Sequence, residues 1–186
     1  MTSAWSLAAV AVLIVTLLAV VPVFTLHDGD STTFLRVGEE APSREVVESD
    51  FEEVHLFPGY GHDGQQFYVL ATAFPDLRSA DGDVDNLPYR ARRILVPALA
   101  SPAPDGTGTV VALVLLNLIA VAAAAVAAAR IARQLGVTPL VALAVPVTPC
   151  VIDSVRGCLA DAPALALALW GVSLFRERPW LAAVLL

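Results

Sequence analysis

The sequence predicts an all-α protein, a multi-pass bundle of transmembrane helices with a mainly helical extracytoplasmic loop after the first span. One observation is the amount of apolar sequence: 57% of the 186 residues are hydrophobic, against roughly 45–50% in soluble domains. A second is its placement, in two blocks at Ala4–Leu26 and at residues 109–186. Both blocks contain runs close to the roughly 20 residues that a helix needs to cross the hydrocarbon core.

The third observation is that the charged residues collect between the two apolar blocks. Residues 27–108 hold 15 of the 18 acidic residues and six of the 11 Arg, and the chain has no Lys. This segment therefore carries a net charge of −9. Nucleic acid is excluded as a partner by this argument, because its phosphates need a basic surface. Residues 1–26 are thus the first transmembrane helix, residues 27–108 the extracytoplasmic loop, and residues 109–186 further transmembrane helices.

The first apolar run is predicted to be a retained transmembrane helix and not a cleaved signal peptide. No Arg or Lys precedes Ala4–Leu26, and no motif of small residues follows it where a signal peptidase would cut. The run is also longer than the apolar core of a signal peptide. Pro22 near its end is tolerated in a membrane helix.

The second apolar block is predicted to contain four helices, the last one incomplete, at about residues 109–129, 137–152, 157–175 and 180–186. Short Arg-bearing turns at 130–136 and 176–179 face the cytoplasm by the positive-inside rule. This orientation places the N-terminus in the cytoplasm and residues 27–108 outside the plasma membrane. The final run is too short to span a bilayer, so we expect the sequence to be the N-terminal part of a longer protein.

Two pairs of residues near the third and fourth runs have open interpretations. Cys150 and Cys158 are expected to be buried thiols, and a disulfide is the alternative in an oxidising compartment. Asp153 and Asp161 are functional candidates because ionisable groups in a membrane span are rarely incidental. The alternative is that both are interfacial, with Asp153 paired to Arg156.

The loop is predicted to contain three helices. Ser43 is expected to cap a helix over Arg44–Leu56, which has one apolar stripe. A second helix starts at Asp63 and runs to about residue 74. The third, Asn86–Ala100, is amphipathic and is expected to lie in the membrane interface with its Arg side chains at the headgroups. The acidic turn before it, Ala80–Asn86, lacks the Gly and Glu that a calcium loop requires, so it is predicted to be solvated, with weak binding of a divalent cation as the alternative.

The segments GHDGQQFYVLA, residues 61–71, and DNLPYRARRILVPALA, residues 85–100, resemble paired motifs of bacterial polytopic membrane proteins. These proteins are similar to the GT-C superfamily of glycosyltransferases. The resemblance implies a catalytic acidic residue in the loop after the first span and a polyprenyl-phosphate sugar as donor. His62, which stands where the pattern has Tyr, and an extra Gln in DGQQFY depart from the motif.

By this resemblance Asp63 is the catalytic residue, acting as the base that deprotonates an acceptor hydroxyl or as a ligand of a divalent cation. Arg90 and Arg93 match the positions that would bind donor phosphate, because a guanidinium fork fits phosphate oxygens. Tyr89 and Gln65 are further candidates for substrate binding.

Both candidate metal ligands have a simpler interpretation. Asp63 followed by Gln66 fits a capping box, in which the carboxylate caps its own helix. His62 would tune Asp63 or bind the cation with it, or it is a partly exposed loop residue.

Three functions follow from these interpretations. The first is a GT-C-like glycosyltransferase whose partners are membrane lipid and a lipid-linked sugar. The second is a non-enzymatic membrane protein, such as a transporter or an envelope assembly component. The third is an inactive, truncated remnant, and the sequence leaves open whether the chain is an enzyme.

Overall fold

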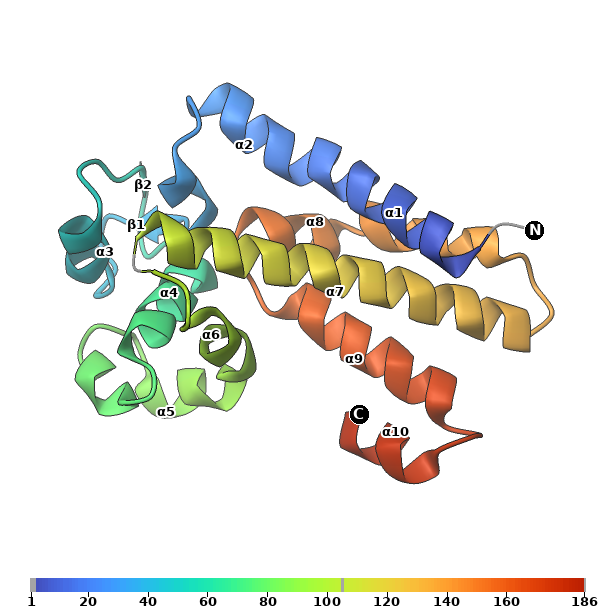
Figure 1. The fold of residues 1–186 in the computed structure, drawn as a ribbon. Coiled ribbons are helices and arrows are strands. Elements are labelled where there is room, and N and C mark those ends of the chain that lie inside the picture. Colours follow the sequence, from blue (N-terminus) through green and yellow to red (C-terminus); the bar gives the residue numbers. More distant parts are fainter. Residues whose placement is uncertain (1–2, 105, 186) are drawn as a thin grey trace.

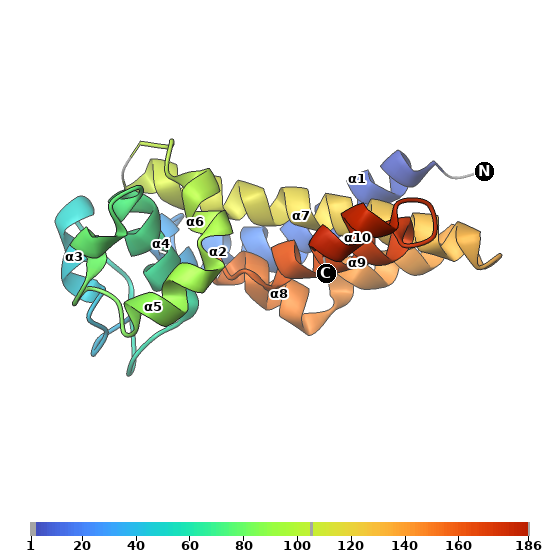
Figure 2. The ribbon, with the colours of Figure 1, turned by 90° about the horizontal axis from the view of Figure 1, so that it is seen from below.

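The computed structural model describes residues 3–104 and 106–185, and within them the fold is all-α apart from one pair of two-residue strands. Apolar helices form a long layered body, and the polar segment folds into a domain at one end of it (Figure 1). The view from below shows the same division (Figure 2). Met1, Thr2, Asp105 and Leu186, which fall in the predicted segments, lie outside the described residues.

The first apolar run forms one 23-residue helical stretch, Ala4–Leu26, with a mean hydropathy of 2.9. It consists of α1 (Ala4–Val15), a π-helical turn η1 (Thr16–Val20) and α2 (Val21–Leu26). Pro22 has no N–H to donate to the carbonyl four residues earlier, that of Leu18. The guanidinium of Arg156 donates to this carbonyl instead, which explains how the helix accommodates a proline.

The second long helix is α7, Thr107–Gln134, with 28 residues and a mean hydropathy of 2.8. It packs against α1 and runs antiparallel to it (Figure 1). Ala120, Ala124 and Ala125 are buried in this contact layer, where small side chains let helix backbones approach closely. Within the described residues, two helices are thus able to cross a membrane by length and composition, or three if a bent pair counts as one span.

The bent pair is the predicted third span, residues 137–152, which the structure breaks into η5 (Pro139–Val147) and α8 (Pro149–Arg156) at an angle of 52°. Its prolines remove the backbone donors that one straight helix needs. The predicted fourth span, residues 157–175, is shortened to the 14-residue α9 (Asp161–Leu174). The short helix α10 (Pro179–Leu185) follows. The predicted multi-pass bundle with four helices in residues 109–186 is therefore not clearly formed.

A buried polar network holds α8 and α9 against the middle of α7. Ser154 Oγ lies 2.8 Å from Asn117 Oδ1 and accepts the N–H of Ala162 at 2.9 Å. Asn117 Nδ2 donates to the carbonyl of Leu113 at 3.1 Å. Such interhelical hydrogen bonds replace the partners that water cannot supply among apolar helices.

The polar segment folds from short elements. In chain order they are η2 (Ser31–Phe34), β1 (Val37–Gly38), α3 (Arg44–Asp50), β2 (Leu56–Phe57), α4 (Asp63–Ala73), η3 (Leu77–Ala80), α5 (Leu87–Arg90), η4 (Ala91–Arg93) and α6 (Leu95–Ala100). The two strands are parallel, with Val37 opposite Leu56. The core of this domain is centred on α4, whose Phe67, Tyr68 and Leu70 are fully buried.

Two of the predicted loop helices are shorter than expected. Helix α3 ends at Asp50 and not at residue 56, because acidic side chains at a helix C-terminus oppose its dipole and Glu52 and Glu53 follow at once. The Ser43 hydroxyl is buried without a hydrogen-bond partner and does not cap α3. The predicted helix 86–100 is divided into α5, η4 and α6; Pro97 cannot donate to the Arg93 carbonyl, where the α-helical pattern is interrupted.

Tyr68 in α4 forms hydrogen bonds both with the end of α3 and with the residue that precedes α7. Its hydroxyl donates to Asp50 Oδ2 at 2.7 Å and accepts the N–H of Gly106, which precedes α7, at 2.9 Å. Because the Tyr68 side chain and Gly106 are both buried, water cannot replace the bond between them, whereas Asp50 lies at the surface.

We expect Tyr68→Phe to lower the free energy of unfolding by about 1–3 kcal/mol, since it leaves the buried N–H of Gly106 without its partner. Thermal unfolding in detergent, followed by fluorescence, measures the effect. Tyr60→Phe is the matched control, because Tyr60 is 71% exposed and its loss of a hydroxyl changes no buried bond. Equal melting temperatures of the two variants would contradict the role of Tyr68.

Candidate functional site

Asp63 is the first residue of α4, and its carboxylate does not cap that helix. The N-cap position belongs to His62, whose backbone is extended and whose side chain makes no capping bond. The predicted capping box is therefore wrong. The side chain of Gln66 instead accepts the N–H of Asp85 at 3.3 Å. The Asp63 carboxylate is left free to face the 85–93 segment.

Arg90 lies between two carboxylates. Its Nη1 is 2.6 Å from Asp63 Oδ1, and its Nε and Nη2 hold both oxygens of Asp85 at 2.7 and 2.6 Å. The side chain of Arg90 is only 11% exposed, so the predicted position of Arg90 at membrane headgroups is wrong. The guanidinium points into the protein because two acids compensate its charge there.

Arg93 completes the cluster from the exposed side. Its Nη1 donates to Asp63 Oδ2 at 3.0 Å and its Nη2 to the Tyr89 hydroxyl at 2.7 Å. The Tyr89 ring also lies 5.1 Å from the Arg93 guanidinium carbon, a cation–π contact. The Asn86 side chain accepts the N–H of Tyr89 at 3.1 Å, as the predicted N-cap of this segment. We call Asp63, Asp85, Tyr89, Arg90 and Arg93 the Asp–Arg cluster.

The charges in the Asp–Arg cluster stabilise one another. The Arg90 guanidinium lowers the pKa of Asp85 below its usual value, and the two carboxylates raise the pKa of Arg90. An ionised Asp85 and a protonated Arg90 therefore stabilise each other in this pair. The four charges sum to zero. Arg93 is the more available cation, with 43% of its side chain exposed against 11% for Arg90.

The predicted substrate ligand Gln65 lies beneath this cluster with its amide engaged by backbone groups. Its Oε1 accepts the N–H of Gly38 at 3.1 Å, and its Nε2 donates to the Tyr60 carbonyl at 2.6 Å. The side chain is 1% exposed. Gln65 thus shapes the floor of a cavity of about 130 Å³ beside Asp63 and Arg90.

Sequence reasoning missed two residues that position the cluster. Asp85 is the first residue of the second motif. An acidic residue three positions before Pro88 was the only sign in the sequence that it could position Arg90. Gly64 lets the start of α4 touch the turn between α8 and α9: a Cβ there would lie 2.2 Å from the Gly157 carbonyl oxygen. This contact brings Asp63 to the end of the apolar helices.

No group of three or more His, Cys, Asp or Glu capable of holding a metal is present among the described residues. His62 is exposed, as a loop His was expected to be. A divalent cation at Asp63 stays a prediction, and such an ion would have to compete with Arg90 and Arg93 for the carboxylate oxygens.

The two Cys and two Asp residues predicted near the third and fourth apolar runs are not part of the Asp–Arg cluster. Cys150 is exposed and Cys158 buried, and both are free thiols, so the disulfide is wrong and only one thiol is buried as expected. Asp153 is exposed, and the described ion pairs do not join it to Arg156, which contacts Leu18 instead. Asp161 opens α9, where a carboxylate interacts favourably with the helix dipole.

Asp85→Asn tests whether the Asp–Arg cluster stabilises the loop. Because the pKa of Asp85 is lowered by folding, its contribution is present above the unfolded pKa and is lost as the pH falls through the folded pKa. We expect a loss on the order of 1 kcal/mol at pH 7, limited by solvent screening at a side chain that is 47% exposed.

The difference between wild type and Asp85→Asn should shrink below about pH 4, where free Asp is protonated. Melting temperatures between pH 7 and pH 3 measure it, with the exposed Asp81→Asn as control. A difference that stays constant across this range would show that the charge of Asp85 is not its source.

Comparisons with known proteins identify no relative of this chain. The chain matches no protein-family model, no curated protein and no solved structure. The resemblance of residues 61–71 and 85–100 to GT-C-like proteins therefore stays a prediction, and the function is argued from the geometry of the cluster and the apolar helices.

Proposed function

We propose that the chain is the N-terminal part of a GT-C-like membrane glycosyltransferase that takes a sugar from polyprenyl phosphate on the extracytoplasmic face. The observation that carries the proposal is the Asp–Arg cluster, in which Asp63 shares its two oxygens between a buried and an exposed Arg. The cluster joins the candidate base Asp63 to both candidate phosphate ligands, Arg90 and Arg93. Gly64 holds it at the end of the apolar helices.

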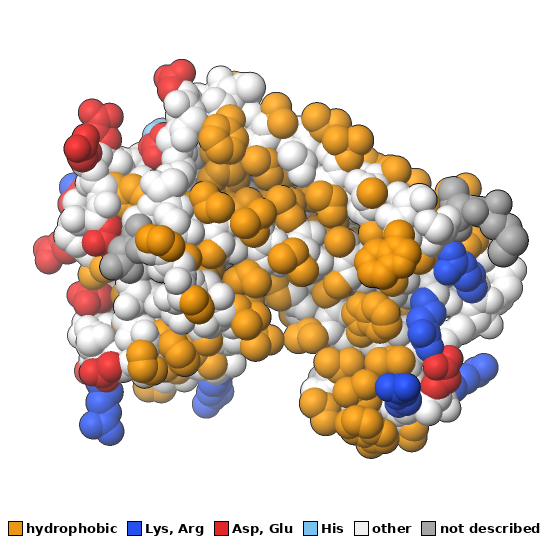
Figure 3. Space-filling view, in the orientation of Figure 1, with side chains coloured by type: hydrophobic (Ala, Val, Ile, Leu, Met, Phe, Trp, Pro, Cys, Tyr) orange, Lys and Arg blue, Asp and Glu red, His pale blue; other side chains and the backbone are white. Residues whose placement is uncertain are grey.

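The distribution of charge supports a location at the plasma membrane with the loop outside. On the face shown in Figure 3, most acidic side chains lie on the loop domain, apolar side chains cover the long helices, and a group of basic side chains lies at the far end. Trp5 and Trp180, which are 78% and 68% exposed, belong to α1 and α10. Exposed Trp is typical of either membrane interface, and Arg in short turns is typical of the cytoplasmic one. The N-terminus would then be cytoplasmic in a multi-pass protein.

An apolar groove supports a lipid-linked donor. It has a volume of about 240 Å³ and lies between α6, α7 and α9, where Leu95, Leu99, Ile119 and Trp170 line it. Leu95 and Leu99 are more than half exposed, and they follow Arg93 by two and six residues in the chain. A prenyl chain in this groove would bring its phosphate towards the exposed Arg of the cluster.

The cluster can perform the transfer if Arg93 changes partner. A donor phosphate attracts Arg93 away from Asp63, because a guanidinium binds phosphate oxygens in a bidentate manner. Asp63 Oδ2 is then able to accept the proton of an acceptor hydroxyl. That hydroxyl oxygen forms the new bond to the sugar as the sugar–phosphate bond breaks, and the phosphate leaves beside Arg93. The leaving phosphate needs charge stabilisation and no general acid.

Asp63→Asn in the full-length protein tests the proposed base. We expect transfer of the sugar from polyprenyl phosphate to fall by about 10²–10⁴-fold, the usual loss when a general base is removed. Radiolabelled sugar released from the donor measures the rate. Asp85→Asn is the matched control, because it also deprives Arg90 of one carboxylate but leaves Asp63.

The two variants separate catalysis from stability. A role for Asp63 in holding Arg90 alone predicts equal losses in both variants. The proposal predicts a large loss only in Asp63→Asn, with similar melting temperatures. Retained transfer in Asp63→Asn would refute the base.

One observation favours the second candidate, a transporter. The bent pair η5 and α8 and the buried Asn117–Ser154 bond place irregular backbone and polar groups among apolar helices, and transporters build their substrate sites from broken helices. This function predicts that Asn117→Leu abolishes uptake and that Asp63→Asn does not. Asn117→Leu and Asp63→Asn together therefore distinguish the two functions.

A further inference from the structure

A second polar cavity lies at the junction between the first apolar helix and the loop domain. It has a volume of about 170 Å³, against roughly 30 Å³ for a water molecule in the liquid, so it can take a phosphate-sized group. Its polar lining comes from three distant parts of the chain: His27 after α2, Thr33 and Arg36 in the loop, and Arg156 in α8. None of the eight described residues that line it is acidic.

This cationic lining is unusual in a segment that is strongly acidic as a whole. In the described structure the Arg36 guanidinium takes part in no ion pair or hydrogen bond, and Arg156 uses one nitrogen for the Leu18 carbonyl. Two half-buried guanidinium groups in one cavity repel each other unless an anion lies between them. An anion with several acceptor oxygens would compensate both charges.

Two further features mark the cavity as incomplete without a ligand. Thr33 is 4% exposed, and its hydroxyl is buried without a hydrogen-bond partner, a condition that costs free energy. Arg36 has a positive φ of 50°, which is uncommon for a residue other than Gly and is found at functional sites. Its carbonyl accepts the N–H of His62 at 3.0 Å, which fixes the backbone that presents the guanidinium.

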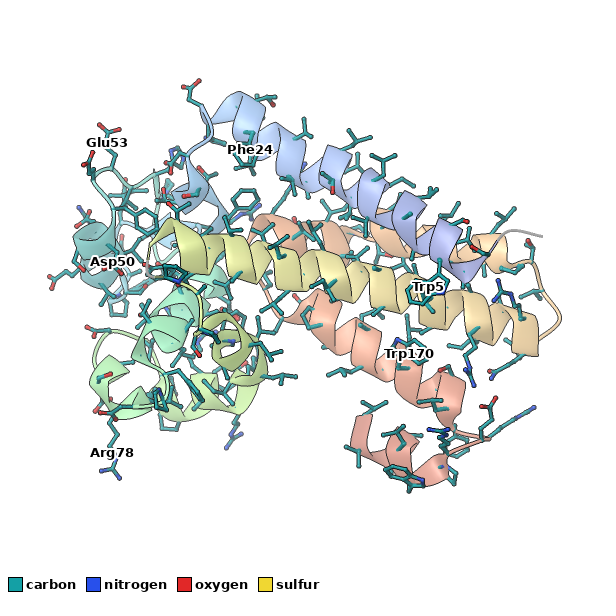
Figure 4. All side chains as sticks on the ribbon, viewed as in Figure 1. Trp5, Phe24, Asp50, Glu53, Arg78 and Trp170 are labelled. Atoms are coloured by element: carbon teal, nitrogen blue, oxygen red, sulfur yellow. The ribbon has the colours of Figure 1, made fainter. Side chains whose placement is uncertain are left out.

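The other wall of the cavity is apolar and belongs to the end of the first apolar helix. Pro22, Val23 and Leu26 line it, and Leu26 is 74% exposed. Phe24, labelled on α2 in Figure 4, is 54% exposed at the same level. A ligand in this cavity thus meets positive charge on one side and the surface of a candidate membrane helix on the other.

We propose that this cavity binds the phosphate headgroup of a lipid, with Arg36, Arg156 and the Thr33 hydroxyl on the phosphate oxygens and the lipid tail along α2. The site uses none of the residues of the Asp–Arg cluster. It does not depend on the glycosyltransferase function, since its test measures binding and not sugar transfer.

Thermal unfolding of the purified chain in a neutral detergent, with dioctanoyl phosphatidic acid as the probe, tests the site. Phosphatidic acid should raise the melting temperature, whereas dioctanoylglycerol, which has the same tails without phosphate, should not. Inorganic phosphate should have little effect at the same concentration. An equal shift with inorganic phosphate would overturn the lipid as the source of the phosphate, and no shift with either would overturn the site.

Variants locate the binding. Arg36→Gln should weaken the apparent affinity for phosphatidic acid about ten-fold or more, the usual effect of losing a charged hydrogen bond. Arg78→Gln removes the same charge from an exposed side chain that points away from the protein (Figure 4), and it should leave the affinity unchanged. If Arg36→Gln retains the affinity of wild type, the cavity is not the binding site.

Thr33→Val gives a second test, because it should raise the melting temperature without lipid but reduce the increase that lipid causes. Without lipid it should raise the melting temperature, because it removes a buried hydroxyl that has no partner. With phosphatidic acid it should show a smaller shift than wild type. A full lipid-dependent shift in this variant would contradict the role of the hydroxyl.

Discussion

The placement of Arg90 between Asp63 and Asp85 is the interaction on which the loop domain depends. A guanidinium that is almost buried has a high desolvation cost, and it is tolerated only when its charge and its donors are compensated. Two carboxylates supply this compensation from the start of α4 and from the turn before α5. The two motifs are therefore held together by electrostatics, and Arg93 is left at the surface as the group that can change partner.

The apolar helices determine where that cluster lies. The polar segment leaves α2 and enters α7 at the same end of the molecule (Figure 1), and Gly64 brings α4 against Gly157 at the turn between α8 and α9. Both proposed sites consequently lie where apolar surface gives way to charged surface. The two sites differ in chemistry. In the Asp–Arg cluster each Arg is paired with an acidic residue, whereas the cavity lined by Arg36 and Arg156 has no acidic residue in its described lining.

Much of this arrangement was predictable from the sequence. Hydropathy identified both long helices, and the motif resemblance paired Asp63 with Arg90, Arg93 and Tyr89, which the structure brings together. Local rules failed where distant partners compete with them. Asp63 does not cap its helix, because two Arg from 27 and 30 residues away bind its carboxylate more strongly than one backbone N–H would. The second cavity was not predictable, since its lining comes from segments with no shared pattern.

Pro22 has a consequence for how the chain assembles in a bilayer. The Leu18 carbonyl has lost its α-helical donor to this proline and receives a hydrogen from Arg156, a residue synthesised 138 positions later. In lipid each backbone carbonyl requires a donor. Arg156 therefore supplies a donor to the first apolar helix from a segment far along the chain. The hydrogen bonding of the first apolar helix thus depends on the docking of α8 beside it.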